Sequence, residues 1–461
     1  MSRARETREK GEKAFTTFAL VLLNRMADWI QSTGLPLRSV QELRFTDSGY
    51  GPHGITIPDY WATLRPHLET IWLMPEAEAC IRELLSCGVL KVPSMSDGVG
   101  NPIPNPSFEQ YKAILINQAT TQIVLSLRQH SCFPLTVKQI QETYTRMKEA
   151  RTSSTRRRRL VVPLFNFQSQ MVPLKFGSLE LTKFSPEEKT ATWNAGPFDM
   201  TVTVYDFSQV KYKLSGSYVQ TEPPSTTKNP TLTDAESVIT ALRLLKSGEV
   251  GALWTWDCPE DPTDSSVIGG VELTPFHARR FGSVYCLCPE DIHGLMTVFE
   301  RLKSLGSQGS LRSVEVGIRR FNQAYGRKIL EDRVIDLTVA LENLLLTGIS
   351  DELQFRLAMR GAALLRKSWC PAKSFSLLQA IYKARSSVVH DGKTLDDPSL
   401  QKEILSKLEP KLDSSQFLDE AERIVRAVLR EYLELLGCGA PLKKINDDLD
   451  RSVLDSLGNG T

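Results

Sequence analysis

The stretch RVIDLTVALENLLL, residues 333–346, is the most informative segment of this 461-residue sequence. Nine of its fourteen residues are apolar, and on a helix they face almost every direction. A helix that is apolar nearly all round is buried on most sides, so it belongs in the middle of a bundle. We therefore expect residues 306–445 to form an all-α bundle, followed by a loose polar tail at residues 446–461. Further helices of the bundle are predicted at residues 352–366, 375–390, 401–408 and 415–436.

The regions before this bundle differ in the period of their apolar residues. From Phe15 to Ile30 apolar side chains recur every three or four positions, which predicts a helix, and similar patterns continue towards residue 155. From Leu160 the period changes to two, and Tyr212 and Leu214 alternate with lysines, which predicts a small antiparallel sheet. A turn is expected at Ser185-Pro186. The fold class is thus multidomain α+β, with a mostly helical N-terminal region (1–155), a β-rich middle domain (156–305) and the helical bundle (306–445).

The charge balance limits how the chain could bind nucleic acid. Lysine and arginine number 56 against 54 acidic residues, a formal net charge of +2, which excludes a histone-like polycation. Contact with RNA would need a local patch, and the candidate is the run Arg156, Arg157, Arg158 and Arg159. Two interpretations stay open, because the run could be a solvated segment at a domain joint or a phosphate-binding patch.

Several classes of protein lack support in the sequence. No window of about 18 uncharged apolar residues is present, so no membrane contact is expected. The eight cysteines are scattered without a repeated CxxC, which predicts a cytoplasmic protein with reduced thiols. Cys286 and Cys288 lie between His277 and His293, but their strand spacing with Val284 favours core cysteines over a zinc site. Walker, GxGxxG and GxSxG motifs are missing, so we expect no cofactor and no metal.

The helix predicted at residues 375–390 has one chemically suggestive edge. At 100° per residue, its apolar side chains gather on one face and Tyr382, Ser386 and His390 on the other, with Arg385 at the seam. An imidazole can take or give a proton, and a guanidinium can stabilise charge on a phosphoryl oxygen. Together they suit cleavage of RNA by its own 2′-hydroxyl, which needs no metal and which DNA cannot undergo.

Several stretches around this helix occur in an order and spacing that carry a resemblance. They are Arg320–Tyr325, Arg333–Leu337, Ala340–Leu345, Glu352–Leu365, Ile381–Arg385 and Val389–Gly392. With them, residues 311–440 resemble a HEPN domain of the ApeA-like group. The resemblance implies a helical bundle that forms a homodimer, in which two Arg-x4–6-His motifs face each other as one ribonuclease site. It assigns His390 as the acid/base residue and Arg385 as the phosphate contact, while Ser386 stands where many active members have Asn, Asp or His.

The resemblance also implies a biological role. ApeA-like proteins are thought to be toxins in defence against phage, so this chain is expected to be a regulated endoribonuclease. The residues before the bundle would then sense an unknown trigger or restrain the nuclease. Two alternatives stay open: a non-catalytic module that binds a nucleotide, RNA or a partner, and a bundle that only dimerises the chain.

Glu342 is a further candidate, since a carboxylate inside a nearly all-apolar helix is costly unless it is paired. One interpretation is a buried ion pair with Arg356 or Arg360. The other is that Glu342 orients Arg385 or His390 at the site.

Overall fold

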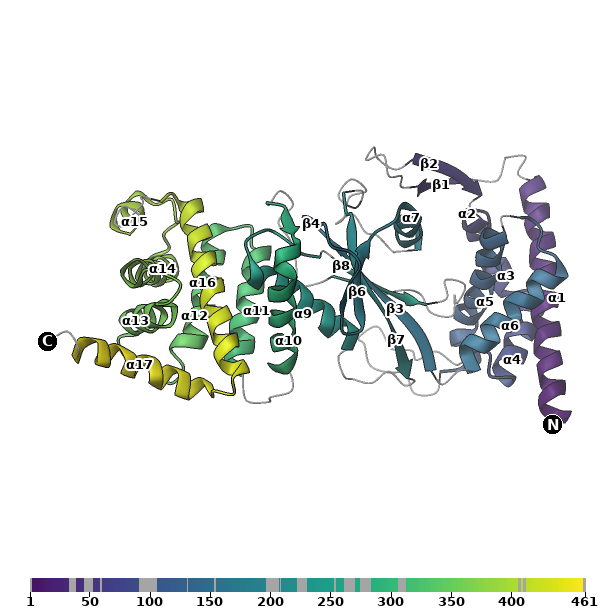
Figure 1. The fold of residues 1–461 in the computed structure, drawn as a ribbon. Helices are drawn as coiled ribbons and strands as arrows, with labels where there is room; N and C mark the ends of the chain where they lie inside the picture. Colours follow the sequence, from purple (N-terminus) through teal and green to yellow (C-terminus); the bar gives the residue numbers. More distant parts are fainter. Residues whose placement is uncertain are drawn as a thin grey trace.

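The chain folds into a helical N-terminal region, a central antiparallel sheet and a C-terminal helical bundle, which follow one another along the molecule (Figure 1). This arrangement confirms the predicted order of helices, sheet and helices. The computed structural model describes residues 2–32, 39–44, 53–58, 60–90, 106–130, 132–152, 155–195, 207, 209–221, 230–252, 254–260, 270–273, 283–305, 312–404, 408 and 412–458.

The N-terminal helices pack around their own hydrophobic core. Phe15, Phe18, Leu22 and Met26, which recur at helical spacing, are all fully buried in it. The helices are α1 (Ser2–Ser32), α2 (Tyr60–Leu64), the 3-10 turn η1 (Arg65–His67), α3 (Leu68–Trp72), α4 (Pro75–Ser86), α5 (Phe108–His130) and α6 (Val137–Thr152). The hairpin of β1 (Ser39–Arg44) and β2 (His53–Pro58) accompanies them.

The middle of the chain forms a six-stranded sheet whose pairings are all antiparallel. The strands, in spatial order, are β5 (Leu174–Phe176), β6 (Leu179–Lys183), β7 (Tyr212–Thr221), β3 (Thr155–Leu164), β8 (Trp254–Pro259) and β9 (Gly270–Leu273). A short parallel pair joins β4 (Phe167–Ser169) to β10 (Tyr285–Leu287).

One element near this sheet differs from the prediction. Where a turn was expected at Ser185-Pro186, the helix α7 (Pro186–Ala195) begins. Ser185 caps it, because its hydroxyl accepts the backbone N–H of Glu188 and its own N–H donates to the Glu188 carboxylate. Proline is favourable at the first helical position, so Pro186 starts the helix and does not mark a turn.

The sheet and the C-terminal bundle share one hydrophobic core. The helices α9 (Pro230–Leu245) and α10 (Ile292–Leu305), with the 3-10 turn η2 (Pro289–Asp291) before α10, lie between them (Figure 1). Buried polar bonds cross the same region: the Arg243 guanidinium donates to Asn322, and Arg426 donates to the Arg243 carbonyl at 2.7 Å. The boundary expected at residues 305/306 therefore does not separate two cores.

The C-terminal bundle is built around α12 (Leu330–Leu345), the helix of the apolar stretch. It packs against four neighbouring helices, as its apolar surface predicts. The other helices are α11 (Arg312–Gly326), α13 (Leu353–Leu365), α14 (Pro371–Asp391), α15 (Pro398–Glu403), α16 (Ser414–Gly437) and α17 (Leu442–Gly458).

The prediction of a loose tail at residues 446–461 is wrong for most of its length, because α17 packs against the bundle along α13 (Figure 1). Ile445 and Leu449, four residues apart, are both buried. Asn446 is also buried and donates to the Leu344 carbonyl at 3.0 Å. The segment contains many acidic residues and only a narrow apolar face, and its composition therefore resembled that of an unstructured tail.

None of the helices that the structure describes is long and apolar enough to cross a membrane.

Candidate functional site

The helix α14 carries the polar edge that the sequence suggested. Leu377, Ile381 and Ala384 are buried on its inner side, which fixes the orientation of the opposite side. The helix ends at Asp391, and Gly392 adopts a left-handed conformation with φ of 65°. Glycine tolerates this conformation without strain, so the sequence places His390 in the last turn.

Glu342, Tyr382 and Arg385 form one cluster where α12 and α14 pack together. Burial raises the pKa of the half-buried Glu342 carboxyl, and the nearby Arg385 guanidinium opposes this shift. Burial also raises the pKa of the Tyr382 hydroxyl, with a further contribution from the Glu342 charge. Of the two interpretations of Glu342, the structure thus favours proximity to Arg385.

The alternative ion pairs of Glu342 do not form. Arg360 donates to both carboxylate oxygens of Asp450, at 2.7 and 2.6 Å, and to the Leu345 carbonyl. Arg356 lies 3.9 Å from the Glu352 carboxylate. Both arginines are therefore engaged away from Glu342.

Arg385 lies near Glu342 but forms no ion pair with it. Within the described residues its guanidinium makes no ion pair of 4 Å or less, and its Nε is buried without a hydrogen-bond partner. An unpaired buried donor is costly, and a guanidinium that forms no ion pair can bind an acceptor such as a phosphate oxygen.

His390 lies on the same edge but stands apart from this cluster. Its side chain is exposed, and Tyr382, Ser386 and His390 follow one another at intervals of four residues. His390 lies five positions after Arg385, or about 7.5 Å along the helix axis. In the part of the chain that the structure describes, no hydrogen bond or ion pair orients the imidazole.

The four consecutive arginines do not make one continuous patch, because they lie on β3, where successive side chains point to opposite faces. Arg158 is buried and donates to Asp257 at 2.9 Å, and Arg159 is half-buried and bonds to Glu188 at 3.2 Å. Arg157 is exposed, while the side chain of Arg156 lies outside the described residues. Arg157 is therefore the one described guanidinium of the run that is exposed and has no carboxylate partner among the described residues.

Cys286, which was expected in the core, lies on the opposite face of its strand, and Cys288 follows the strand and is half-buried. Cys286 is exposed, while its neighbours Tyr285 and Leu287 are buried. The buried face of this strand is therefore the one opposite the cysteine, and the predicted core position of Cys286 is wrong. His277 lies outside the described residues. Among those that are described, no group of three or more His, Cys, Asp or Glu could hold a metal ion.

Comparison with known proteins identifies no relative: no family model, no curated protein and no solved structure matches the chain.

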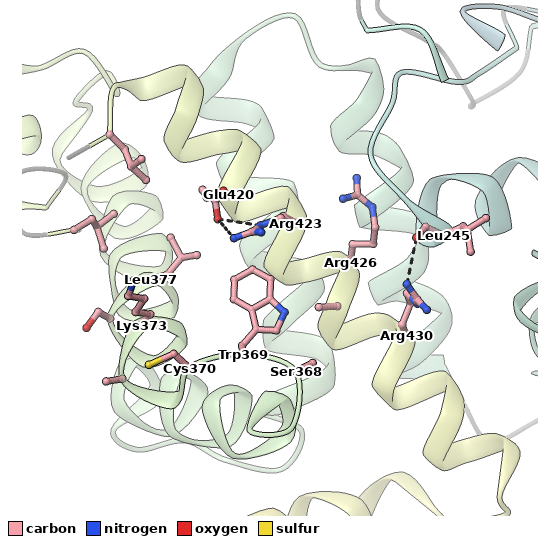
Figure 2. A pocket seen from close by; sticks show the side chains of 15 residues that line it. Leu245, Ser368, Trp369, Cys370, Lys373, Leu377, Glu420, Arg423, Arg426 and Arg430 are labelled. Atoms are coloured by element: carbon pink, nitrogen blue, oxygen red, sulfur yellow. Dashed lines mark hydrogen bonds and ion pairs between the residues drawn. The ribbon is translucent and has the colours of Figure 1, made fainter. Parts of the chain in front are cut away.

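Residues that the sequence reasoning did not single out line a pocket at the other end of α14. Arg423, Arg426 and Arg430 of α16 are among them, and Figure 2 shows Arg423 directed towards Trp369 and Arg430 towards Leu245. Their spacing of three and four residues places them on one helix face, and that pattern could have been noticed in the sequence.

Proposed function

We propose that the chain is a metal-independent endoribonuclease of the HEPN type that cleaves RNA through its 2′-hydroxyl. The observation that carries this proposal is the pair on α14: an arginine whose Nε is buried without a hydrogen-bond partner and, five positions further along the helix, an exposed histidine. The order of apolar and polar stretches from residue 311 to 440 supports the same assignment.

In the proposed reaction His390 acts as general base and takes the proton from the 2′-hydroxyl of the substrate. The freed oxygen attacks the adjacent phosphorus, the bond to the 5′-oxygen breaks, and that oxygen receives a proton from a second acid. The products are a 2′,3′-cyclic phosphate and a 5′-hydroxyl. Arg385 stabilises the negative charge that develops on the phosphoryl oxygens, and Glu342 acts as a positioning residue through Arg385.

The test compares purified parent protein with two variants on a mixed RNA pool in excess EDTA. His390→Ala should lower the cleavage rate by about 100-fold or more, and Arg385→Ala should also abolish cleavage. His293→Ala is the matched control, because His293 is an exposed histidine of α10 outside the site. Variants that cut like the parent would refute the catalytic assignment, as would products without cyclic phosphate ends.

We further propose that the enzyme is a regulated toxin of cellular defence, acting in the cytoplasm, in which the N-terminal regions sense a trigger or restrain cleavage. All eight cysteines are free, which supports a reducing compartment. The shared core between the sheet and the bundle gives a route for such control, since α9 and α10 pack against α16. Expression of the parent should arrest cell growth, and expression of His390→Ala should not.

A second candidate is a non-catalytic module that binds RNA or a partner. The lack of any orienting contact to His390 in the described chain favours it, because catalytic imidazoles are usually held by a hydrogen bond. This alternative predicts no cleavage by the parent in cells or in vitro, with RNA binding that weakens on Arg385→Ala.

A further inference from the structure

The cluster of Glu342, Tyr382 and Arg385 consists of three half-buried polar side chains that lie close together without binding one another. The charge of Arg385 acts on both of the other groups, and the charge of Glu342 acts on Tyr382. Among the described residues, however, none of the three side chains takes part in a hydrogen bond or an ion pair. The cluster is therefore assembled, but its polar groups are unsatisfied.

Such a cluster is uncommon, because polar groups that a fold partly removes from water are usually hydrogen-bonded. The Nε of Arg385 is buried and has no partner at all. The three side chains also differ in chemistry, since the carboxylate of Glu342 accepts hydrogen bonds, the guanidinium donates them and the Tyr382 hydroxyl can do both. The cluster can thus satisfy a ligand that presents both donors and acceptors.

The same place offers apolar surface. Tyr382 contributes an aromatic ring that is only half-buried. Val389 follows Arg385 by four positions on α14, and 47% of it is exposed. Val339 precedes Glu342 by one turn on α12 and is half-buried. Because nucleic-acid bases stack on aromatic side chains, a flat ring suits this surface.

The carboxylate of Glu342 distinguishes between the possible rings. A carboxylate can accept two hydrogen bonds side by side. Among the four RNA bases, guanine is the one whose Watson–Crick edge carries two adjacent donors, N1–H and N2–H. On the same edge of adenine, cytosine and uracil, every donor has an acceptor beside it, which the carboxylate would repel. In single-stranded RNA this edge is free to be read.

We propose that Glu342, Tyr382 and Arg385 form the subsite for one guanine nucleotide of a single-stranded RNA substrate. Tyr382 stacks on the base, Glu342 accepts its N1–H and N2–H, and Arg385 holds the adjacent phosphate. A carboxylate has about four lone-pair positions, so Glu342 can bind the base and still position Arg385. The inference rests on the proposed ribonuclease function, to which it adds the identity of a base next to the cleaved bond.

The first experiment measures binding to the full chain with RNA that cannot be cut. Short fluorescent oligonucleotides of 2′-fluorouridine carry one central guanine or, in its place, hypoxanthine, which lacks the N2 amino group. We expect the guanine oligonucleotide to bind about 10-fold more tightly in fluorescence anisotropy, because only it makes the second hydrogen bond to the carboxylate. Equal affinities, or no binding of either oligonucleotide, would overturn the proposal.

Variants locate the base. Glu342→Gln should reduce the preference for guanine over hypoxanthine to nearly one. Tyr382→Ala should weaken binding of both oligonucleotides by about 10-fold, whereas Tyr382→Phe keeps the ring and should bind like the parent. Glu315→Gln is the matched control, because Glu315 is an exposed glutamate of α11 that does not belong to the cluster. A preference that survives in Glu342→Gln would overturn the assignment.

The second experiment separates this inference from the ribonuclease proposal. The ends of the products that the parent releases from a mixed RNA pool are sequenced. Guanine should be enriched by about 10-fold at one of the two nucleotides that flank the cut, in line with the binding preference. Cleavage without a preferred base would overturn the guanine subsite and leave the nuclease intact. Selective binding of guanine without cleavage would support the subsite and refute the nuclease.

Discussion

One ion pair that contributes to the docking of the C-terminal helix can be removed by a single substitution. Arg360 of α13 donates two hydrogen bonds to Asp450 of α17, and only 5% of the Arg360 side chain is exposed. Asp450→Asn keeps the shape of the side chain but leaves the buried guanidinium without its counter-charge. We expect α17 to detach more often from the bundle in this variant.

The size of the effect follows from the burial of the two partners. Removing one member of a fully buried pair costs about 3–5 kcal/mol. Here 32% of Asp450 is exposed and Arg360 retains its bond to the Leu345 carbonyl, so the cost should be nearer about 2 kcal/mol. At 1.4 kcal/mol per factor of ten, a loss of about 2 kcal/mol raises the equilibrium constant for opening of α17 about 30-fold. The amides of α17 should therefore exchange about 30-fold faster in the variant.

Amide hydrogen exchange of the peptides covering residues 442–458 measures this directly. Asp447→Asn is the control, because Asp447 is exposed on the same helix and its exchange rate should be unchanged. The double variant Arg360→Met, Asp450→Leu should restore protection, since an apolar pair removes the buried charge. Equal protection of α17 in the parent and in Asp450→Asn would refute this reasoning.

The same contact also sets a pH dependence. The Arg360 guanidinium lowers the pKa of Asp450 below its ordinary value of 3.8. For a carboxyl whose folded pKa is lowered, the stabilisation is present above the ordinary value and is lost as the pH falls through the folded pKa. Protection of α17 should therefore fall in acid below about pH 4, and the Asp450→Asn variant should lack this step.

Two further predictions concern Glu342 and the arginine run. Burial raises the pKa of Glu342, so the folded state binds its proton more tightly and stability should decline as the pH rises above the ordinary value of 4.5. Glu342→Gln should remove this decline and should not destabilise the protein at pH 7 in urea unfolding; a loss above about 1 kcal/mol would instead indicate a strong ion pair. Arg158→Ala should lower the free energy of unfolding by about 2 kcal/mol, because it removes the buried arginine that pairs with Asp257 and leaves this carboxylate only its bond from Tyr218. The exposed Arg157→Ala should change it by less than about 0.5 kcal/mol, and equal losses would contradict the alternation along β3.

Apolar periodicity predicted the elements whose buried faces are broad. Residues 333–346 are apolar nearly all round, and α12 indeed lies among four helices. Gly392 predicted the end of α14 because the left-handed conformation just past a helix favours glycine. Sequence could therefore place His390 in a last turn, and the structure has it there.

The elements that the sequence missed have narrow faces or depend on contacts far along the chain. The helix α17 buries only a few side chains between many acidic ones, so its composition resembled that of a loose tail. The sequence left two interpretations of Glu342 open, because its proximity to Arg385 joins two helices separated by a further helix, and no spacing within either one could decide between them. For Arg158 the decisive partner is Asp257, 99 residues away, which turns an apparent solvated charge into a buried one.

The proposed chemistry also bears on the oligomeric state of the bundle. Cleavage through the 2′-hydroxyl removes one proton and supplies another on the opposite side of the phosphorus, so two proton-transfer groups work best. His390 is the only histidine after residue 293, and therefore a second imidazole cannot come from the same bundle. Tyr382 is a poor substitute as an acid, because burial and the Glu342 charge raise the pKa of its hydroxyl. In the proposed reaction, a second copy of the chain would supply the missing group from its own α14.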